Sequence, residues 1–374
     1  IEYGRQGSPS VVVEDLTVKF PTEDGLVSAV SGLTYSVDKG QTLGIVGESG
    51  SGKSVSSMAI LGLHDAKSSR ITGSIRIAGQ EIVGLNEAGM RKLRGASVAM
   101  IFQDALAALH PFYKVGGQLE EAYQVHHPKA SNREARRKAI EMLERVGIPQ
   151  PDRRIDDYPH QFSGGMRQRA MIAMGLINDP SLLIADEPTT ALDVTVQAQI
   201  LDLLQDLQRD RQMAMILVTH DLGVVAGRAH DIAVMYAGRI VEKAPSARLF
   251  AAVRHPYTEA LLRSIPKLEM DKHTRLDAIS GRPPDLVNVP EGCSFAPRCG
   301  YAQDICHTDD PPLQADADDP SHVFACHFPV GETPVPTPGI KADGRPPRVA
   351  ADDTTTPTTT GAGTTGATPT GGVY

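Results

Sequence analysis

Short apolar runs recur along the chain and predict the strands of an α/β protein. Leu43–Val46 has the composition of a buried strand, and Leu182–Ala185 and Met213–Thr219 share it. Val11–Phe20 alternates in part between apolar and polar positions, and Leu33–Val37 alternates again. These two stretches predict a pair of antiparallel strands that leads into the buried strand at Leu43.

Two further strands and a helical stretch are predicted after the first helix. Gly73–Gly79 lies between glycine turns, whereas Ser97–Gln103 is an apolar run that ends in a polar residue. Residues 119–150 have helical periodicity, and Ser131 and Glu134 have the spacing of a capping box. The apolar positions on one face of this stretch are Ala135, Ala139, Met142, Leu143 and Val146. We therefore expect a helical insertion in the α/β pattern.

A glycine-rich stretch separates the strand at Leu43–Val46 from a helix start at Val55. Its residues fit the pattern G-x-x-x-x-G-K-[ST] and are Gly47, Glu48, Ser49, Gly50, Ser51, Gly52, Lys53 and Ser54. Glycines let successive N–H groups point inward, so a polyphosphate can lie at the positive end of the helix. We expect Lys53 to reach the β- and γ-phosphates and Ser54 to bind Mg²⁺. The stretch predicts a nucleoside triphosphate site.

Polar residues at three strand ends complete this predicted site. Asp186 and Glu187 follow the apolar run at 182–185, where α/β folds place their sites. Asp186 is expected to hold Mg²⁺ and Glu187 to polarise the attacking water. Gln103 could contact Mg²⁺ or that water, or be an exposed strand end. His220 could sense the γ-phosphate, or be purely structural.

Composition narrows the class of protein further. The 374 residues carry a net charge of −8, with 41% hydrophobic and 22% charged residues, which is ordinary for a globular protein. The acidic balance disfavours general nucleic-acid binding. No apolar run approaches the roughly 18 residues of a membrane span, and the N-terminus shows no apolar signal region.

A second anion-binding shape appears at Ser163-Gly164-Gly165, which opens a helix. One chain cannot easily wrap both shapes round one nucleotide, which points to a second subunit that supplies this one in trans. The sequence here resembles the ATP-binding subunits of ABC transporters, over roughly residues 10 to 250. The elements that carry the resemblance stand in family order and spacing: Gln103, Ser163-Gly164-Gly165, Asp186-Glu187-Pro188, Thr190-Ala191-Leu192-Asp193 and His220.

The resemblance implies further roles, residue by residue. Phe20 becomes the aromatic that stacks on adenine, although the strand pattern also fits a simple inward residue. Gln103 couples the nucleotide to the membrane partner. Ser163 and Gly165 bind the γ-phosphate of the ATP held by the opposing subunit, Asp193 communicates across the dimer, and His220 contacts the γ-phosphate. In the signature, which is Ser163-Gly164-Gly165 with its neighbours, Phe162 and Met166 stand where the family usually has Leu and Gln, and Met cannot make a polar side-chain contact.

The C-terminal part resembles the extension of oligopeptide/dipeptide importer ATPases, on the basis of His255-Pro256-Tyr257-Thr258 and the cysteine region. This implies an ATPase that works with a second, different ATPase subunit. Two transmembrane permeases and an extracytoplasmic peptide-binding protein complete the expected assembly, with this chain peripheral on the cytoplasmic face of the membrane. A different cargo, such as nickel or glutathione, stays open, because the permeases and binding protein choose it. A soluble ABC ATPase that acts on DNA or ribosomes is disfavoured by the single cassette and the acidic charge.

All four cysteines lie in one Pro/Gly-rich stretch, at Cys293, Cys299, Cys306 and Cys326. Disulfides are rare in the cytoplasm, so the clustering indicates a metal site. Four thiolates suit a [4Fe–4S] cluster. Zinc is the alternative, although the spacings between the cysteines are wider than the paired C-x-x-C of zinc ribbons. His307, His322 and His327 lie nearby and keep a mixed zinc site open; unligated thiols are the third possibility.

The expected fold class is a P-loop ABC ATPase core of α/β type. It has an antiparallel β subdomain and an α-helical subdomain, plus a small cysteine-containing C-terminal extension. We assign the ATPase domain to residues 10–254, with the helical subdomain at about 104–178. The extension covers 255–330. The Pro/Thr/Gly-rich residues 331–374 are expected to be a disordered tail, because they cannot bury enough apolar surface to offset the entropy of ordering.

Overall fold

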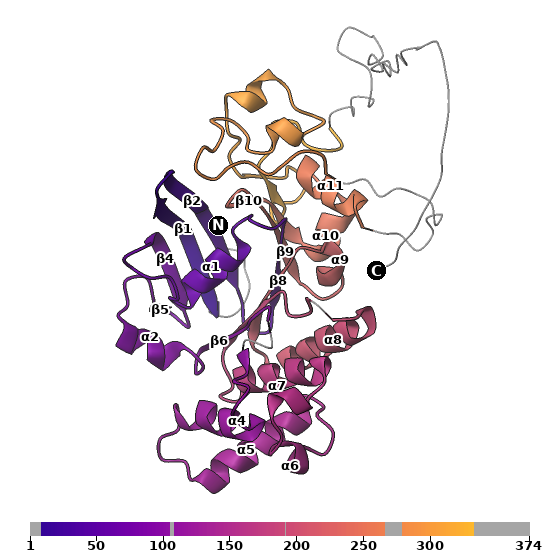
Figure 1. Ribbon diagram of the computed structural model, residues 1–374. Coiled ribbons are helices and arrows are strands. Elements are labelled where there is room, and N and C mark those ends of the chain that lie inside the picture. Colours follow the sequence, from indigo (N-terminus) through magenta and orange to yellow (C-terminus); the bar gives the residue numbers. More distant parts are fainter. Residues whose placement is uncertain (1–8, 105–107, 191, 266–278, 333–374) are drawn as a thin grey trace, which may run out of the picture. The chain divides into compact units, whose positions relative to one another are not determined.

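The computed structural model describes residues 9–104, 108–190, 192–265 and 279–332. Its main feature is an eight-stranded sheet in the order β11-β12-β10-β9-β3-β8-β7-β6 (Figure 1). These strands are β3 (Thr42–Val46), β6 (Val98–Ile101), β7 (Leu182–Asp186), β8 (Ala214–Thr219), β9 (Asp231–Tyr236), β10 (Arg239–Pro245), β11 (Gln314–Ala315) and β12 (Val323–Phe324). The strands from β9 to β6 are parallel.

The parallel strands read as continuous apolar runs because both of their faces are buried. On β7, Leu183 and Ala185 face one hydrophobic core, whereas Leu182 and Ile184 face the other. The register pairs Val46 with Thr219 and aligns the ends of β3, β7 and β8. The residues that follow these strands therefore lie at one edge of the sheet.

A second, antiparallel sheet has the order β2-β1-β4-β5. It comprises β1 (Val11–Thr22), β2 (Gly25–Val37), β4 (Arg70–Ile77) and β5 (Gln80–Glu81). Helix α1 (Lys53–Ile60) packs between this sheet and β7 of the large one (Figure 1). The antiparallel pair predicted before the first buried strand is confirmed, and both strands run longer than the alternation indicated.

The helical insertion consists of several helices rather than one stretch. Its members are α4 (Val115–Gln124), α5 (Asn132–Arg145), α6 (Pro151–Arg154), the turn η1 (Pro159–Gln161) and α7 (Gly164–Leu176). Helices α4, α5 and α7 pack against one another. Ser131 caps α5 as predicted, because its Oγ accepts from the Glu134 N–H at 3.2 Å.

The remaining helices are α2 (Glu87–Leu93), α8 (Val194–Arg211), α9 (Leu222–Val225), α10 (Ser246–Ala251) and α11 (Pro256–Arg263). Helices α8 to α11 lie across the large sheet from α1 and the small sheet (Figure 1). Among the described residues, no helix is both long and apolar enough to cross a bilayer.

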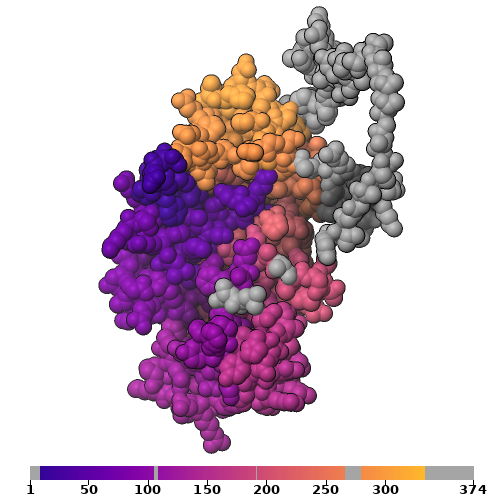
Figure 2. Space-filling model, viewed as in Figure 1, coloured from indigo at the N-terminus to yellow at the C-terminus, as the bar shows by residue number. Residues whose placement is uncertain are grey.

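The C-terminal segment, residues 279–332, packs on the edge of the large sheet. It holds β11, β12 and the short turns η2 (Ala296–Arg298) and η3 (Asp304–His307). Its orange atoms also lie against the indigo atoms of the first strands (Figure 2), where the Ser28 N–H donates to the Leu286 carbonyl at 3.2 Å. The fold class predicted from the sequence is confirmed. The tail predicted at 331–374 falls almost entirely outside the described residues.

Candidate functional site

A cavity of about 960 Å³ opens at the edge of the large sheet where β3, β7 and β8 end. One wall is the glycine-rich loop after β3, and Gln103, Glu187 and His220 form another. Five residues of the C-terminal half also line the cavity: Leu261, Ser264, Ile279, Pro283 and Leu286. The structure thus brings together the loop and three of the predicted catalytic groups.

The loop after β3 encloses the Lys53 side chain, which is 5% exposed. Its Nζ donates to the carbonyls of Gly47 at 2.7 Å and Glu48 at 2.9 Å, which points the ammonium into the curve of the loop. Burial lowers the pKa of Lys53, and the neighbouring carboxylates of Glu187, Asp186 and Glu48 oppose this. Gly52 begins α1 with φ 97°, a left-handed value that favours glycine.

Asp186 contacts Ser54, which lines the cavity, but is not itself part of the lining. The Ser54 side chain hydrogen-bonds to the Asp186 carboxylate, and burial raises the pKa of Asp186. Its Oδ1 is buried, with no hydrogen-bond partner among the described residues. A carboxylate and a hydroxyl are oxygen donors of the kind that Mg²⁺ prefers. The orphaned oxygen therefore fits the predicted magnesium site.

Glu187 stands at the centre of the polar groups. Gln103 Nε2 donates to its carboxylate at 3.2 Å, and Thr190 Oγ1 donates to the same oxygen at 3.0 Å. His220 Nδ1 lies 3.3 Å from the other oxygen. A carboxylate held in this way beside a phosphate-binding loop can orient and polarise a water molecule.

Three other predicted groups lie outside the lining of this cavity. Ser163 caps α7 and, with Gly164, is exposed at the helix N-terminus; Gly165 follows. Asp193 caps α8 by accepting from the Val196 N–H at 3.0 Å. Phe20 packs edge-on against His64, with ring centroids 5.3 Å apart. Their assigned roles stay predictions.

Sequence reasoning missed the contribution of the C-terminal segment. Arg298 forms a two-pronged ion pair with Glu48 of the loop, at 2.6 and 2.9 Å. The Tyr257 hydroxyl accepts from the Glu48 N–H at 2.8 Å. The His255–Thr258 stretch, which includes Tyr257, carries part of the family resemblance. No spacing rule, however, connects Tyr257 or Arg298 to a loop that lies more than 200 positions earlier in the chain.

The four cysteines line a second, much smaller cavity of about 10 Å³. Burial, followed by neighbouring thiols, raises the pKa of Cys299 to about 11 and that of Cys326 to about 12. All four are free. Among the described residues, however, no three His, Cys, Asp or Glu side chains are arranged to hold a metal ion.

The predicted iron–sulfur or zinc site is therefore not supported by this geometry. The four cysteines line one cavity, but the described residues offer no set of three ligands in position to hold a metal ion. One of the three nearby histidines is engaged elsewhere, because His322 Nε2 pairs with the buried Glu242 at 2.7 Å.

Comparison with known proteins adds two family matches. Residues 30–190 match the family described as ABC transporter. Residues 241–306 match the family described as oligopeptide/dipeptide transporter, C-terminal region. The second match begins in β10 and covers Arg298 and three of the cysteines.

Curated relatives and solved structures agree with these matches. The chain is 49% identical over 326 residues to the dipeptide transport ATP-binding protein DppD of Escherichia coli (strain K12), covering 87% of this chain and 98% of the relative. It is 50% identical over 302 residues to the oligopeptide transport ATP-binding protein OppD of Bacillus subtilis (strain 168), covering 80% and 84%. The ATP-binding cassette MJ0796, solved as a dimer with ADP and Pi, superposes with a TM-score of 0.57 at 26% identity, over 63% of this chain and 98% of that one.

Proposed function

The chain belongs to the family of ABC transporter ATP-binding proteins, and we propose that it hydrolyses ATP to power the import of peptides across the cytoplasmic membrane. The curated relatives named above are dipeptide and oligopeptide transport proteins, and they match most of the chain. The match at 241–306 favours this role over that of a soluble ABC ATPase. The observation that carries the chemistry is the Glu187 carboxylate, held by Gln103 and Thr190 beside the Lys53 loop.

In this proposal the loop and Lys53 bind the phosphates of ATP. Backbone N–H groups of the loop, other than those of Glu48 and Ser51, face the phosphates, and Lys53 adds the positive charge. Ser54, Asp186 and Gln103 would hold Mg²⁺, which would neutralise phosphate charge there. Glu187 positions the attacking water, and His220 contacts the γ-phosphate. Phe20 stacks on the base.

A second ATPase subunit completes each site. The anion-binding group at Ser163–Gly165 does not line the cavity that holds Lys53 of the same chain. Its exposed position at the start of α7 leaves it available to the ATP of a partner subunit. ATP then closes the dimer, Asp193 lies at the junction, and hydrolysis reopens it. The segment after Gln103 transmits this motion to the permeases.

The remaining partners follow from the same assignment. We propose two transmembrane permeases, an extracytoplasmic peptide-binding protein and a peripheral position on the cytoplasmic face. The domain boundaries proposed for this role are the ATPase at 10–254, with its helical subdomain at about 104–178, and the extension at 255–330. Residues 331–374 are proposed to be a disordered tail with no assigned function.

The cysteine cavity adds a separate proposal, a [4Fe–4S] cluster with zinc as the alternative. It rests on the four thiols that line one small cavity of about 10 Å³, and these thiols would have to move to ligand positions for a metal to bind. Protein purified without oxygen should then be brown and contain about four irons per chain. Colourless protein with one zinc would favour zinc, and protein without metal would end both versions.

The assembly is tested by purifying the full chain from native membranes in mild detergent and identifying the subunits that accompany it by mass spectrometry. We expect two multi-span permeases and a second ABC subunit. The binding protein in the same set then identifies the cargo, because a peptide-binding protein and a nickel-binding protein are distinguishable by the ligands they bind. Recovery with ribosomal or DNA-repair proteins instead would reject the transport role and leave only the ATPase chemistry.

A further inference from the structure

The phosphate-binding loop carries an acidic side chain, Glu48, in its second position. Its carboxylate lies between the loop and the C-terminal segment, where both oxygens accept from Arg298 at 2.6 and 2.9 Å. The Arg298 side chain is 3% exposed and that of Glu48 is 27% exposed. A guanidinium that is this buried and bonded to both carboxylate oxygens forms one of the stronger ion pairs available to a protein.

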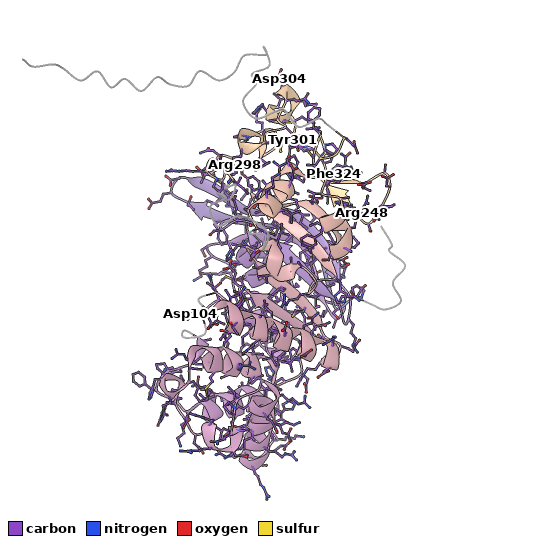
Figure 3. All side chains as sticks on the ribbon, turned by 90° about the vertical axis from the view of Figure 1, so that its right-hand side faces the viewer. Asp104, Arg248, Arg298, Tyr301, Asp304 and Phe324 are labelled. Carbon is purple, nitrogen blue, oxygen red and sulfur yellow. The ribbon has the colours of Figure 1, made fainter. Side chains whose placement is uncertain are left out.

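Arg298 is itself held rigidly by groups around it. Its guanidinium donates to the carbonyls of Ser280 at 3.0 Å and Ile279 at 3.3 Å, and to the Tyr236 hydroxyl at 3.2 Å. Its Cζ lies 5.8 Å from the centre of the Tyr236 ring and 6.0 Å from that of Phe295. Figure 3 labels Arg298 where the C-terminal segment meets the strands. The hydrogen bonds to Glu48 raise the pKa of Arg298, so its charge is permanent.

The backbone of Glu48 is fixed from the same side. Its N–H donates to the hydroxyl of Tyr257, a fully buried residue of α11. The Tyr257 ring packs against Tyr236 and Phe295, with centroids 4.7 and 5.3 Å apart. The C-terminal half of the chain therefore holds both the backbone and the side chain of this loop residue.

The charge of Glu48 matters because of its neighbours. It acts on Lys53 through space, and the loop in which it lies is the surface that phosphates approach. An unpaired carboxylate here would repel a polyphosphate and compete with it for Lys53. Arg298 cancels that charge and turns the carboxylate toward the C-terminal segment.

We propose that Arg298 is a positioning residue for nucleotide binding, which sets the affinity of the phosphate loop for ATP by neutralising and orienting Glu48. The inference rests on the proposed ATPase function and extends it to the C-terminal segment. Arg298 acts on affinity and not on the hydrolysis step, because it contacts the loop and none of Glu187, Gln103 or His220.

The test is equilibrium binding of a fluorescent ATP analogue with Mg²⁺ to the full chain. We expect Arg298→Met to raise the Kd about tenfold, a typical size for coupling between two groups. The double variant Arg298→Met/Glu48→Gln should return the Kd to within about twofold of the wild type, because removing the carboxylate removes the need for its partner. In the assembled ATPase, KM for ATP should rise in Arg298→Met while kcat stays within about twofold.

A matched control separates this effect from general loosening of the segment. Arg254 also ties the segment down, through ion pairs to Asp316 and Glu332, but does not contact the loop. Arg254→Met should lower thermal stability and leave the Kd unchanged. If Arg298→Met does not fold, Arg298→Lys and Arg298→Lys/Glu48→Gln answer the same question. The double variant should then bind the ATP analogue more tightly than Arg298→Lys alone.

Three results would overturn the inference: an unchanged Kd in Arg298→Met, no recovery on adding Glu48→Gln, or an equal rise in Arg254→Met. Wild-type protein that binds no nucleotide would instead reject the proposed function itself. The two failures are therefore distinguishable in one set of measurements.

Discussion

Glu187 adopts a left-handed backbone conformation, with φ 46°, directly after β7. For a residue with a side chain this conformation costs on the order of 1–3 kcal/mol and is retained only where surrounding contacts fix it. Here the Glu187 N–H donates to the Val218 carbonyl at 2.9 Å, which holds the turn against β8. The strained turn places the carboxylate between Gln103 Nε2, which donates to one oxygen, and His220 Nδ1, which lies beside the other.

Replacing Glu187 by Gln should separate ATP binding from turnover. The amide keeps the size of the side chain but cannot accept a proton from water, so kcat should fall about 100-fold or more. The Kd for ATP should stay close to that of the wild type. Phosphate release and nucleotide binding measure the two quantities. Steady-state activity that survives in this variant would show that another residue positions the water.

Lys53→Ala should give the opposite result to Glu187→Gln, with the loss in nucleotide binding rather than in turnover. Its ammonium is buried within the loop and supplies the positive charge for the phosphates, so its removal should weaken nucleotide binding itself. Equilibrium binding should show the loss before any effect on chemistry can be measured. Unchanged affinity would place the phosphates elsewhere.

At the scale of elements, two glycines of the loop between β3 and α1 form a matched pair. Gly50 has φ 80° and Gly52 has φ 97°, so an added side chain is strained at both. A Cβ at Gly50 meets nothing within 4 Å, whereas one at Gly52 lies 2.4 Å from the Ala29 carbonyl.

Gly50→Ala should therefore lower the free energy of unfolding by about 1 kcal/mol and Gly52→Ala by about 3 kcal/mol or more. Urea denaturation measures both. Equal losses would mean that the backbone conformation alone, and not the approach of β2, requires glycine at position 52.

Local sequence was sufficient to predict the helices and strands that are marked by a local pattern of apolar or capping residues. The apolar runs of β3, β7 and β8 and the cap at Ser131 were placed correctly, because burial on both faces and capping are local properties. The separate helices α4 and α6 were not predicted, because the periodicity at 119–150 indicates one helical region despite Pro128 and Gly147 at its breaks. The stretch Ser163-Gly164-Gly165 was predicted to open a helix, and α7 begins at Gly164 with Ser163 as its cap.

The stability with which the C-terminal segment packs on β10 should depend on pH. Arg254 hydrogen-bonds to the 3% exposed Asp316 and holds its pKa at about 2, below the ordinary 3.8. A depressed carboxyl pKa gives stability that is complete above about pH 4 and is lost as the pH falls toward 2.

Asp316→Asn should accordingly lower the free energy of unfolding by about 2 kcal/mol at pH 6, and this difference should vanish near pH 2. Chemical denaturation of both proteins across this range measures it. A difference that is constant with pH would assign the stability to packing rather than to the charge of Asp316.

For the whole molecule, the sequence indicated the nucleotide chemistry but not how the C-terminal segment contributes to it. Lys53, Asp186, Glu187 and their neighbours stand in short patterns whose spacing reflects a strand end or a helix start. Arg298 has no such pattern, because its relation to Glu48 exists only after the segment has folded back over 250 residues. Long-range ion pairs of this kind leave no periodic trace in one sequence.

At the scale of the assembly, Ser163–Gly165 should bind the ATP that is held by a partner subunit. The exposed residue Gly164 provides the test. A Cβ at Gly164 comes no nearer than 4.0 Å to any side chain, so substitutions fit in the folded chain. In Gly164→Asp, a carboxylate at the start of α7 favours the helix but repels the phosphates of a partner's ATP. The variant should therefore match the wild type in thermal stability and in the Kd for ATP of the single chain. ATPase activity in the assembled transporter should fall at least tenfold, a loss of about 1.4 kcal/mol in transition-state stabilisation.

Gly164→Ala is the matched control, since it adds the same Cβ without the charge and should retain most of the activity. If Gly164→Asp weakened ATP binding by the single chain, the signature would have to act on the nucleotide of its own subunit. Since Ser163–Gly165 lie outside the Lys53 cavity, that outcome would require α7 to move toward the loop within one chain. Full activity of the assembled variant would instead exclude the start of α7 from the ATP-bound interface, so each result assigns the second anion-binding shape to a definite subunit or to none.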